Sequence, residues 1–142
     1  MSLEMTAGEL TAFLDREFPQ VAGEFAIEDL DEMRIRTRLR VGDAHLRPGG
    51  TVSGPSIFAL ADVTVYLAIL AMIGPRALAV TTNCSIDFMR KPAARTDLIA
   101  ECRLLKLGRV LAVGEVLIFS ENGADPVARA SLTYSIPPRS GG

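Results

Sequence analysis

Hydrophobic residues near the start of the chain recur at the spacing of a helix. Segment 6–18 places apolar side chains three and four positions apart. It begins with Thr6 and Glu9 at capping-box spacing and is followed by Pro19, which stops a helix. The pattern predicts a short amphipathic helix that covers part of a hydrophobic core.

Elsewhere polar and apolar residues alternate with the period of two that is typical of strands. Residues 24–41 alternate four arginines with apolar side chains, and predict either a strand pair or one long bent strand. The arginine row has no interleaved aromatics, so we interpret it as a solvated sheet face or a subunit contact rather than a nucleic-acid surface. Four further strands are predicted over residues 78–92, 96–107, 109–123 and 125–138.

The stretch Ile57–Ile73 predicts a helix that is apolar on every side. Ser53 suits its N-cap, Pro55 its first turn and Gly74 its end. The run is shorter than the roughly 20 residues of a membrane span and contains Asp62, which favours a buried core helix.

Together these elements predict a single α+β domain over residues 1–142, with a curved antiparallel sheet wrapped around the long helix. The sheet can cover only one side of that helix. The N-terminal helix and a second subunit are expected to cover the rest.

Composition narrows the possible partners. The net charge of −2 argues against nucleic acid and anionic membranes. Cys84 and Cys102 lack metal-ligand spacing and His45 is the single histidine, so we expect no metal site and interpret both cysteines as core residues. The N-terminus lacks the basic and apolar regions of a signal peptide, which favours a cytoplasmic location.

Asp62 is the one acid in the apolar helix. Burying an unpaired carboxylate costs roughly several kcal/mol or more. Asp62 is therefore paired, protonated, covered by another chain or functional.

Several motifs occur in an order that resembles a known family. A glycine-rich loop leads to a helix that opens at Gly54 and carries ALAD, and CSIDFMRKP and LLKLGRVLAVGEV follow. Over Arg47–Tyr134 the chain resembles the hotdog-fold acyl-CoA thioesterases of the phenylacetic-acid-degradation (PaaI-like) type. The resemblance implies a hotdog fold, hydrolysis of an acyl-CoA thioester and a homodimer with sites at its interface. In some relatives dimers pair into tetramers.

The resemblance also implies roles for individual residues. Asp62 stands at the place of the catalytic carboxylate, and Gly54 where a backbone N–H holds the thioester oxygen. The family's His-Gly-Gly reads Ser53-Gly54-Pro55 here. We include Ser53 among the substrate-binding residues, although its simplest role is a helix cap.

Thr81 matches a hydroxyl residue near the catalytic water of the family. Asn83 is expected on the same strand face, so that either side chain can orient the water. Arg90 and Lys91 are expected to meet the phosphates of coenzyme A. Other cations with the same expected role are Arg95, Lys106 and Arg109.

The chemistry makes a geometric demand. Thioester hydrolysis needs stabilisation of an oxyanion, which N–H groups at a helix start provide, and a base or nucleophile, which Asp62 provides. Gly54 and Asp62 are eight residues apart, about 12 Å along one helix. Both can act on one carbonyl only if they come from antiparallel helices of two subunits.

Two alternatives remain. Pro55 removes an N–H donor at the helix start, which keeps open a non-catalytic module that binds acyl-CoA or lipid. A hotdog hydratase would need a histidine near the acid, and only His45 is available. For the thioesterase we expect no metal or redox cofactor, and coenzyme A enters only as part of the substrate.

Overall fold

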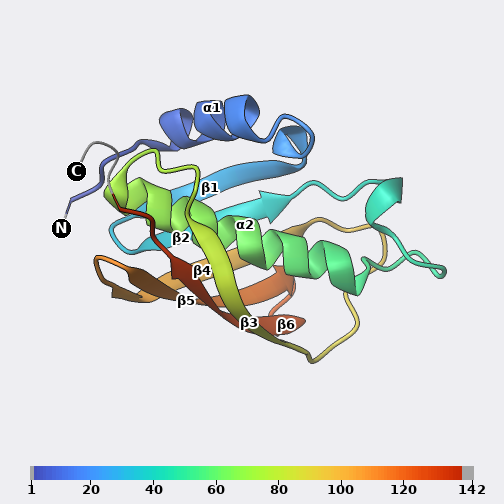
Figure 1. Cartoon of the computed structure of the whole chain (residues 1–142). Coiled ribbons are helices and arrows are strands. Elements are labelled where there is room, and N and C mark those ends of the chain that lie inside the picture. Colours follow the sequence, from blue (N-terminus) through green and yellow to red (C-terminus); the bar gives the residue numbers. More distant parts are fainter. Residues whose placement is uncertain (1, 139–142) are drawn as a thin grey trace.

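The computed structural model describes residues 2–138, in which a curved antiparallel sheet wraps around a long helix (Figure 1). The helices are α1 (Ala7–Glu17) and α2 (Gly54–Ile73), with the short 3-10 turns η1 (Ala22–Glu24) and η2 (Asp43–His45). The strands are β1 (Phe25–Asp31), β2 (Arg34–Leu39), β3 (Val80–Phe88), β4 (Leu98–Leu107), β5 (Leu111–Ser120) and β6 (Ala128–Ser135). The predicted α+β class is confirmed.

The strands are arranged in the order β1-β2-β4-β5-β6-β3. Residues 24–41 form a strand pair rather than one bent strand, and Met33 in its turn has a φ of 62°. Strands β4, β5 and β6 follow one another as hairpins, whereas β3 pairs with β6. The first of the four later strands, β3, therefore forms no hairpin with β4, the strand that follows it in the sequence. Alternation along a strand sets which face is buried but not which strand lies alongside it.

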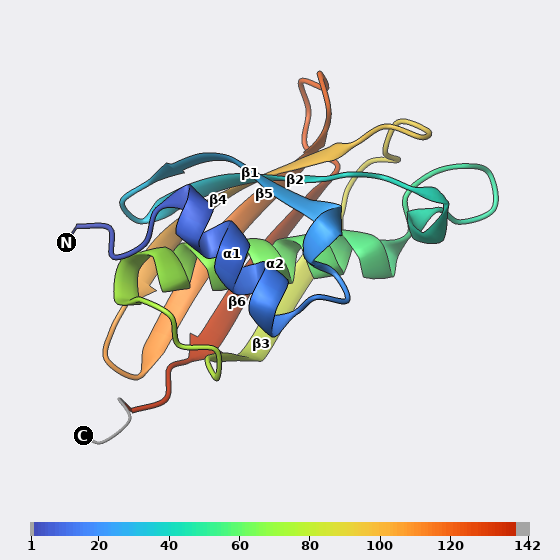
Figure 2. The same ribbon diagram turned by 90° about the horizontal axis from the view of Figure 1, so that it is seen from above.

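Helix α1 begins as predicted. The Thr6 hydroxyl accepts the Glu9 N–H at 3.1 Å, and the Glu9 carboxylate accepts the Thr6 N–H at 2.9 Å. Leu10 and Phe13 are buried, and α1 contacts both β1 and α2. Seen from above, α1 crosses over α2 and covers part of it (Figure 2).

Helix α2 is the core of the molecule. The Ser53 hydroxyl accepts the Ser56 N–H at 3.4 Å, and Gly74 ends the helix with a φ of 91°. Although α2 is long and apolar enough to cross a membrane, 67% of its most hydropathic window is buried within the protein. It is the buried core helix of the fold and gives no evidence of a membrane.

The packing of α2 against β5 depends on the missing side chain of Gly114. A Cβ at this position would lie 3.0 Å from Val65 Cγ1, and Val65 is fully buried. We expect Gly114→Ala to lower the free energy of unfolding by about 1–3 kcal/mol, the usual cost of overpacking a core. Gly23→Ala is the control, because a Cβ there meets nothing within 4 Å. Equal stability of the two variants in chemical denaturation would contradict the close packing.

The arginine row lies on the outer face of the sheet, as predicted. Its member Arg38 contacts three carboxylates, those of Glu28 at 3.1 Å, Asp97 at 2.9 Å and Glu121 at 2.7 Å. The alternate residues of β2 are buried against the core. The row is thus a charged outer surface, and Arg38 ties two loops to it.

Asp97 links this surface to the end of β2. Burial opposes ionisation of Asp97, but the N–H of Val41 at 2.9 Å and the guanidinium of Arg38 outweigh it and lower its pKa below the ordinary 3.8. A carboxyl whose pKa is lower in the folded state stabilises the protein above its unfolded pKa, and this contribution is lost as the pH falls through the folded value.

We expect Asp97→Asn to lower the free energy of unfolding at pH 7 by about 1.5–3 kcal/mol, the scale of hydrogen bonds to charged groups. The difference from the wild type should shrink as the pH falls below 3.8, where the wild-type carboxyl becomes protonated. Unfolding curves at pH 7 and at about pH 3 would measure it. A difference that does not change with pH would contradict the assigned role of the charge.

Candidate active site

Asp62 lies near the middle of α2, on the side that faces β3 and β6. The Thr81 hydroxyl donates to Asp62 Oδ1 at 2.5 Å. The Tyr134 hydroxyl lies 2.7 Å from the same oxygen and 3.0 Å from the main-chain oxygen of Asp62. Two hydroxyls from two strands therefore hold one oxygen of the carboxylate.

The second carboxylate oxygen, Oδ2 of Asp62, has a different environment. Within residues 2–138 it accepts no hydrogen bond from a side chain or a loop N–H. In the same part of the chain, no buried side-chain oxygen or nitrogen lacks a partner, so Oδ2 of this half-buried residue is open to solvent. One oxygen is anchored, and the other is available to a water, a substrate or a second chain.

Tyr134 is a contact of Asp62 that the sequence analysis missed. Burial and the negative charge of Asp62 raise the pKa of its phenol well above the ordinary value, so the hydroxyl stays protonated and donates. A signal was available in the sequence. Tyr134 falls in the apolar row of the last predicted strand, and a buried phenol needs a hydrogen-bond partner.

The two polar residues predicted on β3 lie on opposite faces of the sheet. Thr81 pairs with Tyr134 and points toward α2, as expected, whereas Asn83 pairs with Thr133 and is exposed. A bulge at Thr82 inserts one residue between them. The expectation that Asn83 shares the face of Thr81 is wrong, because one extra residue reverses the alternation of side chains.

The start of α2 presents a free backbone donor. Ser53 caps the Ser56 N–H, Pro55 has no N–H, and the Ile57 N–H bonds to the Ser53 carbonyl at 3.1 Å. Among the first four helical residues, only the N–H of Gly54 lacks a partner within the described chain. An N–H at this place suits an oxygen that carries negative charge.

A cleft of about 700 Å³ opens beside this donor. Its walls include Gly54 and Phe88, together with the three cations Arg47, Arg90 and Lys91. The predicted pair Arg90 and Lys91 is therefore beside the helix start, and Arg47 is an addition that the sequence analysis missed. Arg47 lies in an irregular loop, where no periodicity indicates which way a side chain points.

The other predicted cations lie elsewhere. Arg95 contacts Asp43 at 3.5 Å and does not line the cleft. Lys106 and Arg109 flank the β4–β5 turn, at the opposite end of the sheet from the start of α2 (Figure 1). Within one chain the expectation that they share a phosphate site with Arg90 is wrong.

Gly54 and Asp62 belong to the same continuous helix α2. Their separation along it is about 12 Å, from the rise of 1.5 Å per residue. The acid and the free N–H of one chain therefore cannot touch the same carbonyl group. The structure therefore has the separation between Gly54 and Asp62 that the sequence predicts.

A six-stranded antiparallel sheet wrapped around one long helix is the hotdog fold. A model of the thioesterase superfamily matches residues 49–127. The crystal structure of a "putative thioesterase" from Silicibacter sp. TM1040 superposes with a TM-score of 0.92 at 59% identity, over 97% of this chain and 96% of that chain. The protein described here belongs to the thioesterase superfamily.

Two other solved structures have the same fold. A variant of the phenylacetic acid degradation protein PaaI from Thermus thermophilus has a TM-score of 0.72 at 27% identity, over 84% of this chain and 99% of that chain. A "hypothetical thioesterase protein" from Streptococcus pneumoniae has a TM-score of 0.75 at 20% identity, over 92% of this chain and 98% of that chain. A search of curated proteins found no match.

Proposed function

We propose that this protein is a cytoplasmic acyl-CoA thioesterase that hydrolyses its substrate to a free acid and coenzyme A. The observation that carries the proposal is the state of Asp62, which has one oxygen held by two hydroxyls and the other free. A carboxylate fixed in this way is positioned to activate a water or to attack a carbonyl carbon.

The exposed surface of α2 supports a homodimer. Pro55, Phe58 and Ala59 are exposed at helical spacing and continue as one stripe to the half-buried Asp62. Beside the stripe, the edge strand β3 pairs with β6 on one side only, which leaves its other edge free to pair. Two chains related by a two-fold axis could lay these surfaces together, with their α2 helices antiparallel.

In this arrangement each site takes groups from both chains. Asp62 of one chain faces Gly54 of the partner subunit, whose free N–H would polarise the thioester carbonyl and hold the developing oxyanion. Oδ2 of Asp62 either takes a proton from the attacking water or attacks the carbonyl carbon itself, after which water cleaves the acyl-enzyme. In both routes the thiolate of coenzyme A leaves and accepts a proton. Thr81 and Tyr134 keep the carboxylate in place.

The cationic cleft supports coenzyme A as the leaving group. Arg47, Arg90 and Lys91 are suited to phosphate oxygens and line the same cleft as Gly54, the oxyanion donor. The "hypothetical thioesterase protein" from Streptococcus pneumoniae was solved with coenzyme A. We propose the same ligand for this cleft, and the pairing of two dimers into a tetramer as a further level of assembly.

A non-catalytic acyl-CoA or lipid-binding module is the second candidate. It is favoured by the single N–H donor at the start of α2, since Pro55 contributes none. Release of free thiol from medium-chain, long-chain and aromatic acyl-CoAs separates the two functions. Release that disappears in Asp62→Asn supports the thioesterase, and tight binding without release supports the module.

A further inference from the structure

The loop between β2 and α2 has to deliver Gly54 to a defined position. This loop runs from residue 40 to 53 and has only the short turn η2 as regular structure, apart from a bridge between Leu46 and Val52. His45, the last residue of η2, is the single histidine of the chain. Its side chain is 12% exposed, so it is mostly enclosed.

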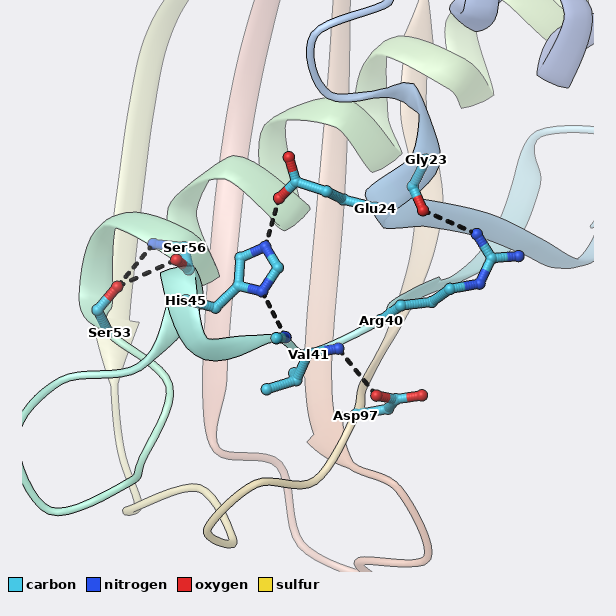
Figure 3. Close-up of polar contacts among 9 residues, drawn as sticks. Gly23, Glu24, Arg40, Val41, His45, Ser53, Ser56 and Asp97 are labelled. Atoms are coloured by element: carbon cyan, nitrogen blue, oxygen red, sulfur yellow. Dashed lines mark hydrogen bonds and ion pairs between the residues drawn. The ribbon is translucent and has the colours of Figure 1, made fainter.

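Both ring nitrogens of His45 are engaged (Figure 3). Nδ1 accepts the N–H of Gly42 at 2.8 Å. Because Nδ1 acts as an acceptor, the neutral ring carries its proton on Nε2, which donates to the carboxylate of Glu24. An imidazole with neither nitrogen free is not placed to act as a general base.

The main chain of His45 leads directly to the start of α2. Its carbonyl accepts the N–H of Ser53 at 2.8 Å, and the Ser53 carbonyl accepts the N–H of Ile57 at 3.1 Å. Ser53 immediately precedes Gly54. A shift of His45 would therefore be passed through one hydrogen bond to the peptide that carries the free N–H.

Glu24 anchors this series of hydrogen bonds to the sheet. Its carbonyl accepts the N–H of Arg40 at 2.8 Å, and the neighbouring carbonyl of Gly23 accepts Nη1 of Arg40 at 3.0 Å (Figure 3). These bonds tie Glu24 to the end of β2. At the next residue of the chain, the Asp97 carboxylate accepts the N–H of Val41 at 2.9 Å. The Glu24 carboxylate is thus fixed relative to the sheet, whereas His45 lies in the loop that precedes α2.

We propose that Glu24 and His45 form a positioning pair, which fixes the start of α2 so that the N–H of Gly54 meets the thioester oxygen. The inference rests on the proposed function, and it assigns to that function two residues that lie outside the lining of the cleft. The pair acts through Ser53 and touches no substrate. Its effect falls on turnover, because an oxyanion donor acts mainly in the transition state.

Substitutions of His45 separate its two ring contacts. In His45→Asn the amide oxygen can replace Nδ1 toward Gly42 but does not reach Glu24, whereas in His45→Gln the amide nitrogen can replace Nε2 toward Glu24. We expect His45→Ala and His45→Asn to lower kcat by about tenfold, with KM changed less than about twofold, because small misplacements of catalytic groups are costly. His45→Gln should recover most of the loss.

A double-mutant cycle tests whether Glu24 acts through His45. Glu24→Ala should reduce kcat as much as His45→Ala, and the double variant should lose no more than either single one. Asp43→Asn is the matched control, since it removes a charge in the same turn from a side chain that is 97% exposed. Its kcat should equal that of the wild type.

The backbone amide signal of Gly54 in an NMR spectrum provides a readout that does not depend on turnover. It should shift in His45→Ala and return toward the wild-type position in His45→Gln. An unmoved Gly54 signal, or an unchanged kcat in His45→Ala while Asp62→Asn is inactive, would overturn the positioning role and leave the proposed function standing. A wild type that hydrolyses no acyl-CoA would overturn both.

Discussion

Asp62→Asn should lower kcat for acyl-CoA hydrolysis by about 10²–10⁴-fold, the usual contribution of a positioned base. The asparagine keeps an oxygen that can accept from Thr81 and Tyr134, so the local structure should persist. The open Oδ2 becomes an amide nitrogen, which cannot take a proton from water or attack a carbonyl carbon. Thiol release under saturating substrate measures the loss.

Tyr134→Phe is the matched control for this experiment. It removes one of the two hydroxyls that hold Oδ1 and leaves the carboxylate itself intact. We expect a loss of about tenfold, because the acid is held less firmly rather than removed. Turnover by Asp62→Asn equal to that of the wild type would remove Asp62 from the reaction.

Gly54→Pro should lower kcat by about 10²–10³-fold, the effect of removing one oxyanion donor. Proline is well tolerated in the first turn of a helix, and the extended conformation of Ser53, with a φ of −72° and a ψ of 155°, suits a residue that precedes proline. The substitution therefore removes the free N–H and little else. Kinetics with a single acyl-CoA would show the effect in kcat.

Gly54→Ala is the control that keeps the N–H. A Cβ at this position would lie 3.6 Å from the ring of Phe88, which is an ordinary contact. This variant should retain most of the wild-type kcat. An equal and large loss in the alanine and proline variants would show that bulk at this position matters and would contradict the role of the N–H.

Mixing the two inactive chains tests the shared site. If Asp62 works with Gly54 of the partner subunit, a mixed dimer of Asp62→Asn and Gly54→Pro chains has one doubly defective site and one intact site. Random exchange of equal amounts makes half of the dimers mixed, so about a quarter of the wild-type activity should return. No recovery after confirmed exchange would place both groups in one chain's own site and contradict the interface.

Much of the fold could be predicted because its signals are local. The capping box at Thr6 and the caps of α2 at Ser53 and Gly74 mark helix ends through contacts within a few residues. The alternation in residues 24–41 placed the arginines on the outer face of the sheet. Asp62 is recognisable from an equally local signal, because it is the one acid in the apolar helix.

The failures concern contacts between distant segments or a single backbone irregularity. The pairing of β3 with β6 joins segments far apart in the sequence and has no local signature. One bulge at Thr82 moved Asn83 to the wrong face, and nothing in the residue types there demands a bulge. Tyr134 approaches Asp62 only because β6 crosses beneath α2. The cations were misjudged because a position near the end of a strand does not say which end of the sheet it occupies.

Gly114 has a consequence for the chemistry as well as for stability. Val65, which rests on its bare backbone, lies on α2 less than one turn after Asp62. The absence of a side chain in β5 therefore sets the depth at which the helix sits, and with it the reach of the carboxylate toward Thr81 and Tyr134. We expect a methyl group at residue 114 to push Val65 and the neighbouring turn of α2 away from the sheet. Asp62 would then lie farther from the hydroxyls of Thr81 and Tyr134.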